Sequence, residues 1–248
     1  MTSVSAAVLT TAAKREGRST RLRPTTKTLL LTGADGVIGS ILRRHLAARY
    51  RLRLLSRSPM EETSFVADVA DYDAILPAFG GVASVVHLAA ASATDSPWDE
   101  VLASNIIGTR NVFEAAREAG VAQVVFASSN HVVGMYEKDG APDIYRRHDP
   151  TLIDESAEMR PDSLYGHLPA HWLGLGAGRG TQGPPPGRGD LAEPPRLRAR
   201  DCAQLFARAI DADDVRWLVA YGISDNPRQF WSLRSAREVL GFAPQDGT

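Results

Sequence analysis

The amino-acid sequence predicts an α/β fold in which helices cover both faces of a doubly wound parallel sheet. Short apolar runs alternate along the chain with stretches whose apolar residues keep helical spacing. Two of these runs, 83–88 and 124–127, read as buried strands. An earlier apolar run, which begins at Leu29, ends in a glycine-rich turn. This turn is the strongest indication of function in the sequence.

Three glycines spaced three residues apart follow the first predicted strand. Residues 29–39 read Leu-Leu-Leu-Thr-Gly-Ala-Asp-Gly-Val-Ile-Gly, and an amphipathic stretch comes next. Gly33 permits a sharp turn, Gly36 lets the backbone approach a pyrophosphate, and Gly39 lets the helix pack closely on the strand. The helix N-terminus offers free N–H groups to phosphates. An ordinary glycine-rich turn is the alternative, but the strand and helix around it favour a Rossmann-type dinucleotide site.

The other elements alternate as such a sheet requires, so ligand should bind at the carboxyl ends of its strands. Helix-forming patterns are expected at 38–46, 72–79, 98–119 (capped by Gly120), 201–210 and 235–240 (closed by Gly241). Strands are expected at 51–55, 65–66, 83–88, 124–127 and 217–221. Asp201 is the expected N-cap of its helix, whose apolar face comprises Cys202, Leu205, Phe206, Ala209 and Ile210.

The regular pattern breaks between His167 and Arg200. These 34 residues hold seven Gly and six Pro, with no Val, Ile, Phe, Tyr, Ser or Lys. Such a composition cannot sustain a helix or a central strand. We therefore divide the chain into a disordered extension (1–27), a dinucleotide-binding domain (28–166), an irregular segment (167–200) and a helix-strand-helix part of the same domain (201–248).

Composition excludes several classes of function. The 248 residues carry a net charge of −1, so the sequence gives no sign of a basic surface that would bind nucleic acid or an anionic membrane. No apolar run reaches membrane-spanning length. A single cysteine, Cys202, rules out an internal disulfide and suits a cytoplasmic protein. Pro169 lies between His167 and His171, so no metal site is expected.

Residues 1–27 are rich in Ser, Thr and Arg, and Glu16 is the only acidic residue among them. A transit peptide fits this composition, but a disordered tail or an upstream start site is the simpler interpretation.

The motifs together resemble the extended short-chain dehydrogenase/reductase family, also called NAD-dependent epimerase/dehydratases. Within it, Ser128-Ser129-Asn130-His131-Val132-Val133-Gly134 is similar to uronate dehydrogenases and their relatives. Further matches lie at 32–39, 86–90, 105–109, 164–166, 221–226 and 240–244. The resemblance covers about 28–166 and 200–245. It implies an NAD(P)-dependent oxidoreductase acting on a small sugar or uronic acid by hydride transfer, with a homo-oligomer as an open alternative.

The resemblance also assigns roles to individual residues. Tyr165 matches the tyrosine that exchanges a proton with the substrate hydroxyl, and Ser129 matches the serine that hydrogen-bonds the same oxygen. Ser92, Asn130 and His131 match positions that face the sugar. The expected cofactor-binding residues are Gly33, Asp35, Gly36, Val37, Ile38, Gly39, Ser56, Arg57, Asp68, Val69, Leu88, Ala89, Ala90 and Asn105.

The family's lysine, four residues after the tyrosine, is replaced by Pro169. That lysine lowers the pKa of the tyrosine, which is about 10 in a free side chain. The family's substrate-carboxylate arginine also falls in the altered segment. A shifted reading frame across 167–200 would explain why the family's motifs stop there and resume at Asp201. A divergent insert is the alternative. The chain is then a weak enzyme, a dinucleotide-binding protein without catalysis, or a truncated product that does not fold stably.

The end of the second predicted strand bears on the choice of cofactor. An acidic residue there would bind the ribose 2′-hydroxyl of NAD, but this chain has Ser56 followed by Arg57. A small polar residue beside an arginine suits a 2′-phosphate, so the pair favours NADP over NAD. A solvated surface arginine is the alternative.

Overall fold

The computed structural model describes residues 7–8, 27–61, 64–145, 152–166, 197–226 and 229–247. In this part of the chain the strands form one sheet in the order β4-β3-β2-β5-β6-β1-β7. They are β1 (Ala7–Val8), β2 (Thr28–Thr32), β3 (Arg51–Ser56), β4 (Ser64–Val66), β5 (Ser84–His87), β6 (Gln123–Phe126) and β7 (Leu218–Val219). Strands β2 to β6 pair in parallel, which confirms the predicted sheet.

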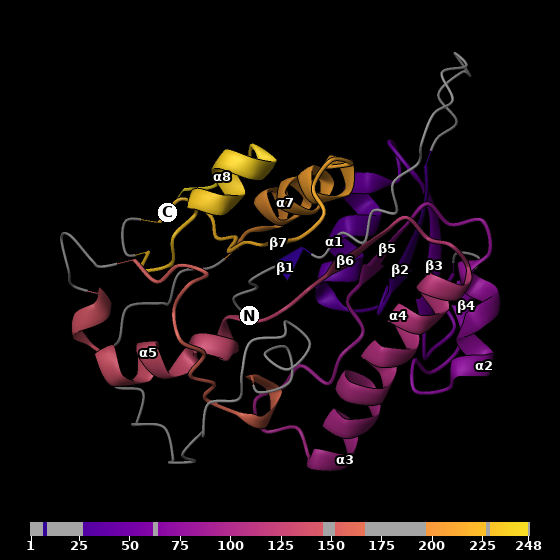
Figure 1. Cartoon of the computed structure of the whole chain (residues 1–248), viewed down its shortest axis with the longest axis horizontal. Coiled ribbons are helices and arrows are strands. Elements are labelled where there is room, and N and C mark those ends of the chain that lie inside the picture. The colour runs from indigo at the N-terminus through magenta and orange to yellow at the C-terminus, as the bar shows by residue number, and fades with distance from the viewer. Residues whose placement is uncertain are drawn as a thin grey trace.

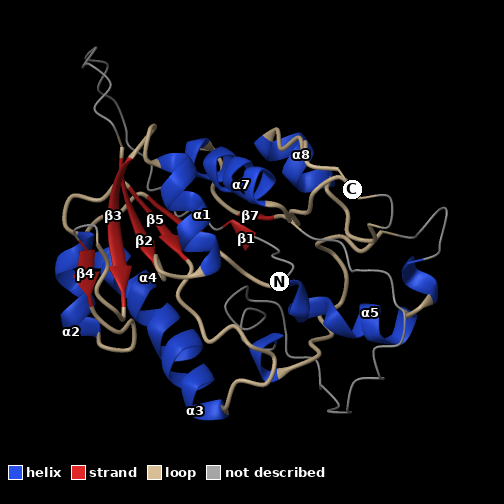
Figure 2. Cartoon of the chain, turned by 180° about the vertical axis from the view of Figure 1, so that it is seen from behind, coloured by secondary structure: helices blue, strands red, loops and turns tan. Residues whose placement is uncertain are grey.

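Helices lie on both faces of this sheet (Figures 1 and 2). They are α1 (Val37–Leu46), α2 (Tyr72–Ile75), α3 (Trp98–Val101), α4 (Gly108–Glu118), α5 (Gly134–Gly140), α7 (Ala199–Asp211) and α8 (Arg234–Leu240). Short 3-10 turns cover 76–79, 130–133 and 143–145. Helix α5 lies apart from the parallel strands, on the side of the sheet away from β4 (Figure 1). None of the helices within the described ranges is long and apolar enough to cross a membrane.

The alternation of side chains along β2 builds two cores. Leu29 and Leu31 pack with α1 and α7, whereas Leu30 packs with α2 and α4 on the other face. All three leucines are fully buried. The predicted apolar face of α7 is also buried, from Cys202 to Ile210. The central strand β2 is therefore covered on both faces, as its apolar composition requires.

The helix predicted at 98–119 is one helical stretch with a change of winding in its middle. Residues 102–107 are π-helical and lie between α3 and α4. A Cβ at Gly108 would lie 2.5 Å from Cγ2 of Val69, so the lack of a side chain lets α4 approach the loop after β4. π-helical segments often accompany functional positions, and this one carries Asn105.

The predicted cap of α7 is wrong. The helix expected at Asp201 begins at Ala199, so Asp201 is not its N-cap. The carboxylate of Asp201 is fully buried and instead accepts the backbone N–H groups of Gln245 (2.8 Å) and Asp246 (3.1 Å). The residue therefore fastens the C-terminal segment to α7.

Part of the segment expected to be disordered forms a short strand. Ala7 and Val8 pair antiparallel with β7, and Ala7 also pairs with Phe126 of β6. Residues 1–6, 9–26 and 167–196 lie outside the described residues, so the expected disorder of those stretches stays a prediction.

A buried histidine connects the two central strands to α4. His87 Nδ1 lies 2.7 Å from Thr32 Oγ1, and His87 Nε2 lies 3.1 Å from Thr109 Oγ1. Thr32 Oγ1 also accepts the N–H groups of Leu88 (3.1 Å) and Ala89 (3.2 Å). With both of its lone pairs engaged, the Thr32 hydroxyl donates to Nδ1, so Nε2 carries the ring proton and donates to Thr109.

Burial keeps this ring neutral, and that makes folding sensitive to acid. Burial lowers the pKa of His87 to about 3, from an ordinary value near 6.5. Between these values the unfolded chain binds a proton that the folded chain does not, so stability falls as the pH drops below about 6.5.

We predict that His87 costs the fold about 2 kcal/mol of unfolding free energy between pH 7 and pH 5. Urea unfolding at both pH values should show this loss in the wild type, and a smaller loss in His87→Gln. His45→Gln is the matched control, because His45 is exposed on α1. An unchanged pH dependence in His87→Gln would contradict the assignment.

Candidate dinucleotide and active site

The three glycines of the turn after β2 differ in what they permit. Gly33 has a φ of +63°, which favours glycine, and a Cβ there would lie 2.7 Å from the Ala89 nitrogen. A Cβ at Gly39 would lie 2.5 Å from the Gly33 oxygen, so Gly39 allows α1 to pack against the turn. Gly33 has the sharp turn predicted for it, whereas the atoms nearest to Gly39 belong to the turn, at Gly33 and Ala34, rather than to the strand on which close packing was predicted.

Gly36 is less constrained by its own surroundings than the other two glycines are. Its φ of −70° and ψ of 175° suit any residue, and a Cβ would meet only the Gly33 oxygen, at 3.3 Å. It is the N-cap of α1, whose first N–H groups have no partner within the helix. Asp35, Gly36 and Val37 are exposed here, while Ile38 is partly buried. The turn thus leaves an open space in front of a helix N-terminus, which fits a pyrophosphate.

The end of β3 lies directly beside this turn. The Ala34 N–H donates to the Leu55 oxygen at 3.3 Å, so Ser56 and Arg57 follow at the edge of the turn. Ser56 is buried, and its hydroxyl donates to the Ser58 oxygen at 2.5 Å. Arg57 is exposed. Ser56 therefore shapes the loop, and Arg57 is the group free to reach a ligand.

Asp68 and Val69 follow β4 and face different ways. Asp68 is exposed, and its carboxylate accepts the Ala70 N–H at 2.9 Å. Val69 is 4% exposed and packs against Gly108, while its backbone oxygen accepts from the Asn111 amide at 3.0 Å. The Val69 side chain thus serves the core, so any contact of this pair with adenine would come from Asp68 or the backbone.

The loop after β5 is held by Asn105. The Asn105 amide oxygen accepts the Ala91 N–H at 2.7 Å, and its nitrogen donates to the Ala91 oxygen at 3.1 Å. This bidentate pair fixes the loop that contains Leu88, Ala89, Ala90 and Ser92. Leu88 and Ala89 are half-buried, whereas Ala90 and Ser92 are exposed. Asn105 therefore shapes the predicted cofactor loop through its contacts with Ala91.

Ser129 and Tyr165 come together at the end of β6. Ser129 caps the 3-10 turn at 130–133 and is 5% exposed. Burial raises the pKa of the Tyr165 phenol, and a hydrogen bond with the Ser129 side chain opposes that rise. The structure therefore places the predicted serine and tyrosine in contact.

Asn130 and His131 lie next to this pair. Asn130 is 3% exposed, and its Oδ1 atom has no hydrogen-bond partner among the described residues. An unpaired buried acceptor costs about 1–3 kcal/mol, which a donor on a ligand would recover. The His131 ring makes an edge contact with the Tyr165 ring, with centroids 5.8 Å apart.

Sequence reasoning missed two residues of this cluster. Asp162 accepts from His131 Nδ1 at 2.9 Å, and Lys138 Nζ donates to the Asp162 backbone oxygen at 3.0 Å. Asp162 lies three residues before Tyr165, and that proximity was the only available signal. Lys138 lies 27 positions before Tyr165 and reaches the cluster only through the docking of α5.

Pro169 and the other residues up to 196 lie outside the described residues. The site as described therefore ends at Gly166. Within the described ranges no three His, Cys, Asp or Glu side chains form a group that could hold a metal ion.

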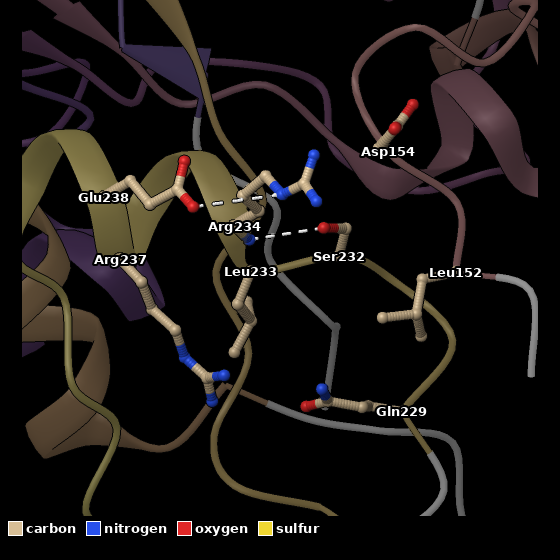
Figure 3. Close-up of a pocket in the computed structure, with 8 residues that line it drawn as sticks. All are labelled: Leu152, Asp154, Gln229, Ser232, Leu233, Arg234, Arg237 and Glu238. Carbon is tan, nitrogen blue, oxygen red and sulfur yellow. Dashed lines mark hydrogen bonds and ion pairs between the residues drawn. The ribbon is translucent and has the colours of Figure 1, made fainter. Parts of the chain in front are cut away.

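A pocket of about 660 Å³ lies elsewhere, at the start of α8 (Figure 3). Its lining contains none of the predicted site residues and comprises Leu152, Asp154, Gln229, Ser232, Leu233, Arg234, Arg237 and Glu238. Arg234 Nε lies 3.9 Å from Glu238 Oε1, and Arg237 extends away from this pair in Figure 3. Both members of this ion pair are largely exposed, so the pocket resembles a solvated surface hollow.

Several known proteins are similar to this chain in sequence and in fold. A NAD-dependent glucose-6-phosphate dehydrogenase from Haloferax volcanii is 39% identical over 246 residues, covering 89% of this chain and 94% of that protein. A uronate dehydrogenase from Pseudomonas syringae pv. tomato is 34% identical over 240 residues, covering 89% of this chain and 82% of that protein.

Solved structures agree with these relatives. The crystal structure of uronate dehydrogenase from Agrobacterium tumefaciens superposes with a TM-score of 0.70 at 28% identity, covering 90% of this chain and 85% of that one. Residues 29–170 also match the family model described as the NAD dependent epimerase/dehydratase family. The glycine turn, the parallel sheet and the Ser129–Tyr165 contact all lie within that match, and the chain belongs to the NAD-dependent epimerase/dehydratase family.

Proposed function

We propose that this protein binds a nicotinamide dinucleotide and oxidises a hydroxyl of a small sugar or uronic acid. The observation that carries the proposal is the contact of Ser129 with Tyr165 on the same sheet edge as the open glycine turn. That edge is the switch point of the sheet, since the chain passes from β4 on one side of β2 to β5 on the other. Relatives whose names specify glucose 6-phosphate and uronates support the substrate class.

The bound dinucleotide would supply the acceptor for a hydride. Tyr165 would take the proton of the substrate hydroxyl, and Ser129 would hold the same oxygen by a hydrogen bond. Asn130 would accept a hydrogen bond from a sugar hydroxyl through its unpaired Oδ1, with Ser92 on the loop after β5 as a further polar contact. Gly33, Gly36 and Gly39 would admit the pyrophosphate, with Asp35, Val37, Ile38, Leu88, Ala89 and Ala90 lining its surroundings.

Tyr165 is poorly prepared to act as a base. Burial raises the pKa of its phenol, and the sequence has Pro169 where the family has its lysine. A general base works best when its pKa lies near the working pH. We therefore infer slow turnover, with cofactor binding retained. A dinucleotide-binding protein without catalysis is the second candidate, and Pro169 is the observation that favours it.

We propose that the cofactor site accepts NADP as well as NAD, through Arg57. The relatives support NAD, and the preference for NADP rests on this chain's own Ser56–Arg57 pair. Arg57 is exposed next to the glycine turn, where a 2′-phosphate would add a charge-assisted contact.

Gly36→Val should weaken binding of both dinucleotides by about tenfold or more, because the side chain would fill the space left for the pyrophosphate. Fluorescence titration with NADH and NADPH measures the loss. Gly80→Ala is the control, since a Cβ there meets nothing closer than 3.9 Å. Unchanged affinity in Gly36→Val, with its fold intact, would refute the site.

Arg57→Ala should cost NADP about 1.5–3 kcal/mol of binding free energy and leave NAD within about twofold. Calorimetric titration of both cofactors makes the comparison. Arg51→Ala is the matched control, because Arg51 is exposed at the opposite end of β3. An equal loss for both cofactors would make Arg57 an ordinary surface charge.

NAD(P)H formation with glucuronate, galacturonate or glucose 6-phosphate should be slow, and Tyr165→Phe should reduce it by about 10²-fold or more. Pro169→Lys should raise the wild-type rate if the missing ammonium is the only defect. Tyr136→Phe, on α5, serves as the control for loss of a phenol. Cofactor binding with no turnover in any of these variants would support the non-catalytic candidate.

A further inference from the structure

The carboxylate of Asp162 is the centre of a polar cluster beside Tyr165. His131 Nδ1 lies 2.9 Å from Asp162 Oδ1 and 3.0 Å from Oδ2. The Ser163 hydroxyl donates to Oδ1 at 3.1 Å, and Lys138 Nζ lies 3.9 Å from Oδ2. The Asp162 side chain is 9% exposed and that of His131 is 20% exposed.

The backbone around Asp162 is docked just as closely. The Asp162 N–H donates to the His131 oxygen at 3.3 Å, and the Met135 N–H donates to the Arg160 oxygen at 2.9 Å. A Cβ at Gly134 would lie 2.4 Å from the Asp162 carboxyl carbon. A Cβ at Gly166 would lie 2.2 Å from the His131 oxygen. The segment 160–166, which carries Tyr165, is therefore fitted at two glycines to the segment 131–140, which includes α5.

These contacts determine which nitrogen of His131 faces the site. An ionised Asp162 only accepts, so Nδ1 must carry the proton that lies between them. Nε2 is then the free nitrogen of the ring that contacts Tyr165 by its edge. Burial raises the pKa of Asp162, but the hydrogen bond and charge of His131, the charge of Lys138 and the Ser163 hydroxyl outweigh it and keep that pKa below its ordinary value.

We propose that Asp162 is a positioning residue, which holds His131 in its Nδ1–H tautomer and fixes the ring relative to Tyr165. The proposal rests on the proposed function, because His131 is one of the groups expected to face the sugar. Nε2 would then accept a hydrogen bond from a substrate hydroxyl next to the hydroxyl that Tyr165 serves. Metal-binding histidines are oriented in the same physical way, by a carboxylate on the other ring nitrogen.

An exposed pair between the same two segments provides the control. Arg160 Nη2 lies 2.6 Å from Asp139 Oδ2, with both side chains at least 39% exposed. Asp139→Asn therefore removes a carboxylate from α5 that bridges the same segments without touching His131.

The first test is the tautomer of His131 in the wild-type protein. Nitrogen-15 NMR of the imidazole rings, with His131 assigned by its loss in His131→Gln, should show a protonated Nδ1 and an unprotonated Nε2 at pH 8. An Nε2–H tautomer, or an even mixture of the two, would overturn the proposal. This measurement needs no Asp162 variant and no enzymatic turnover.

The second test compares variants on the dinucleotide-bound protein. Glucuronate affinity should fall about tenfold in Asp162→Ala and less in Asp162→Asn, whose amide oxygen still accepts from Nδ1. Asp139→Asn should leave it within about twofold, and NADH affinity should be unchanged in all three, which shows that they are folded. Equal glucuronate affinity in Asp162→Ala and Asp139→Asn would overturn the proposal.

The two ideas fail in different ways. If the wild type binds NADH but no sugar acid or sugar phosphate, the proposed substrate class is wrong, while the His131 tautomer still decides the role of Asp162. If sugar acids bind but Asp162→Ala leaves both affinity and tautomer unchanged, the positioning role is wrong and the proposed function stands.

Discussion

The Thr32 hydroxyl is the interaction on which the ligand-binding edge of the sheet depends. It receives the first two N–H groups of the loop after β5 and donates to a histidine that is itself bonded to α4. One side chain therefore ties β2, β5 and α4 together where the glycine turn leaves the sheet. Thr32 and His87 are fully buried, so their polar atoms cannot bond to water and the loss of any of these hydrogen bonds would be costly. The loop after β5 therefore has little freedom to move away from the glycine turn.

A second constraint extends that order to the predicted catalytic groups. β5 supports β6 along its whole length, and the Ala127 N–H continues the ladder to the His87 oxygen. Ser129 follows two residues later and caps the turn that contains Asn130 and His131. The segment with Tyr165 then docks on that turn through Asp162 and Gly166. The site is thus assembled from β2 outward, each layer resting on the one before it.

Much of this could be predicted from local patterns. The glycine spacing, the apolar strands and the caps at Gly120 and Gly241 all reflect short-range physics, and each appears close to its predicted place. Contacts between distant segments could not be predicted. The bond between Thr32 and His87 spans 55 positions, and that between His131 and Asp162 spans 31. Neither residue pair has a spacing that would single it out.

The incorrect expectations have the same origin. Asp201 has the right residue type for an N-cap, yet its carboxylate is drawn into the interior by two N–H groups more than forty positions away. Asn105 stays a predicted cofactor-binding residue, but the engagement of its amide with Ala91, across a π-helical turn that no residue pattern marks, could not be predicted either. β1 pairs with a sheet edge far along the chain, and its two residues carry no strand signal of their own.

The balance of charge around Tyr165 explains why the missing lysine matters. The cluster brings one permanent cation, Lys138, toward the tyrosine segment, since the proposed Nδ1–H tautomer of His131 is neutral. Lys138, however, lies near the carboxylate of Asp162, which offsets its positive charge. Glu137, a partly buried acid that accepts the Tyr145 hydroxyl, adds no positive charge either. Within the described part of the chain, the same carboxylate that orders the site therefore leaves Tyr165 without a net cation to lower its pKa.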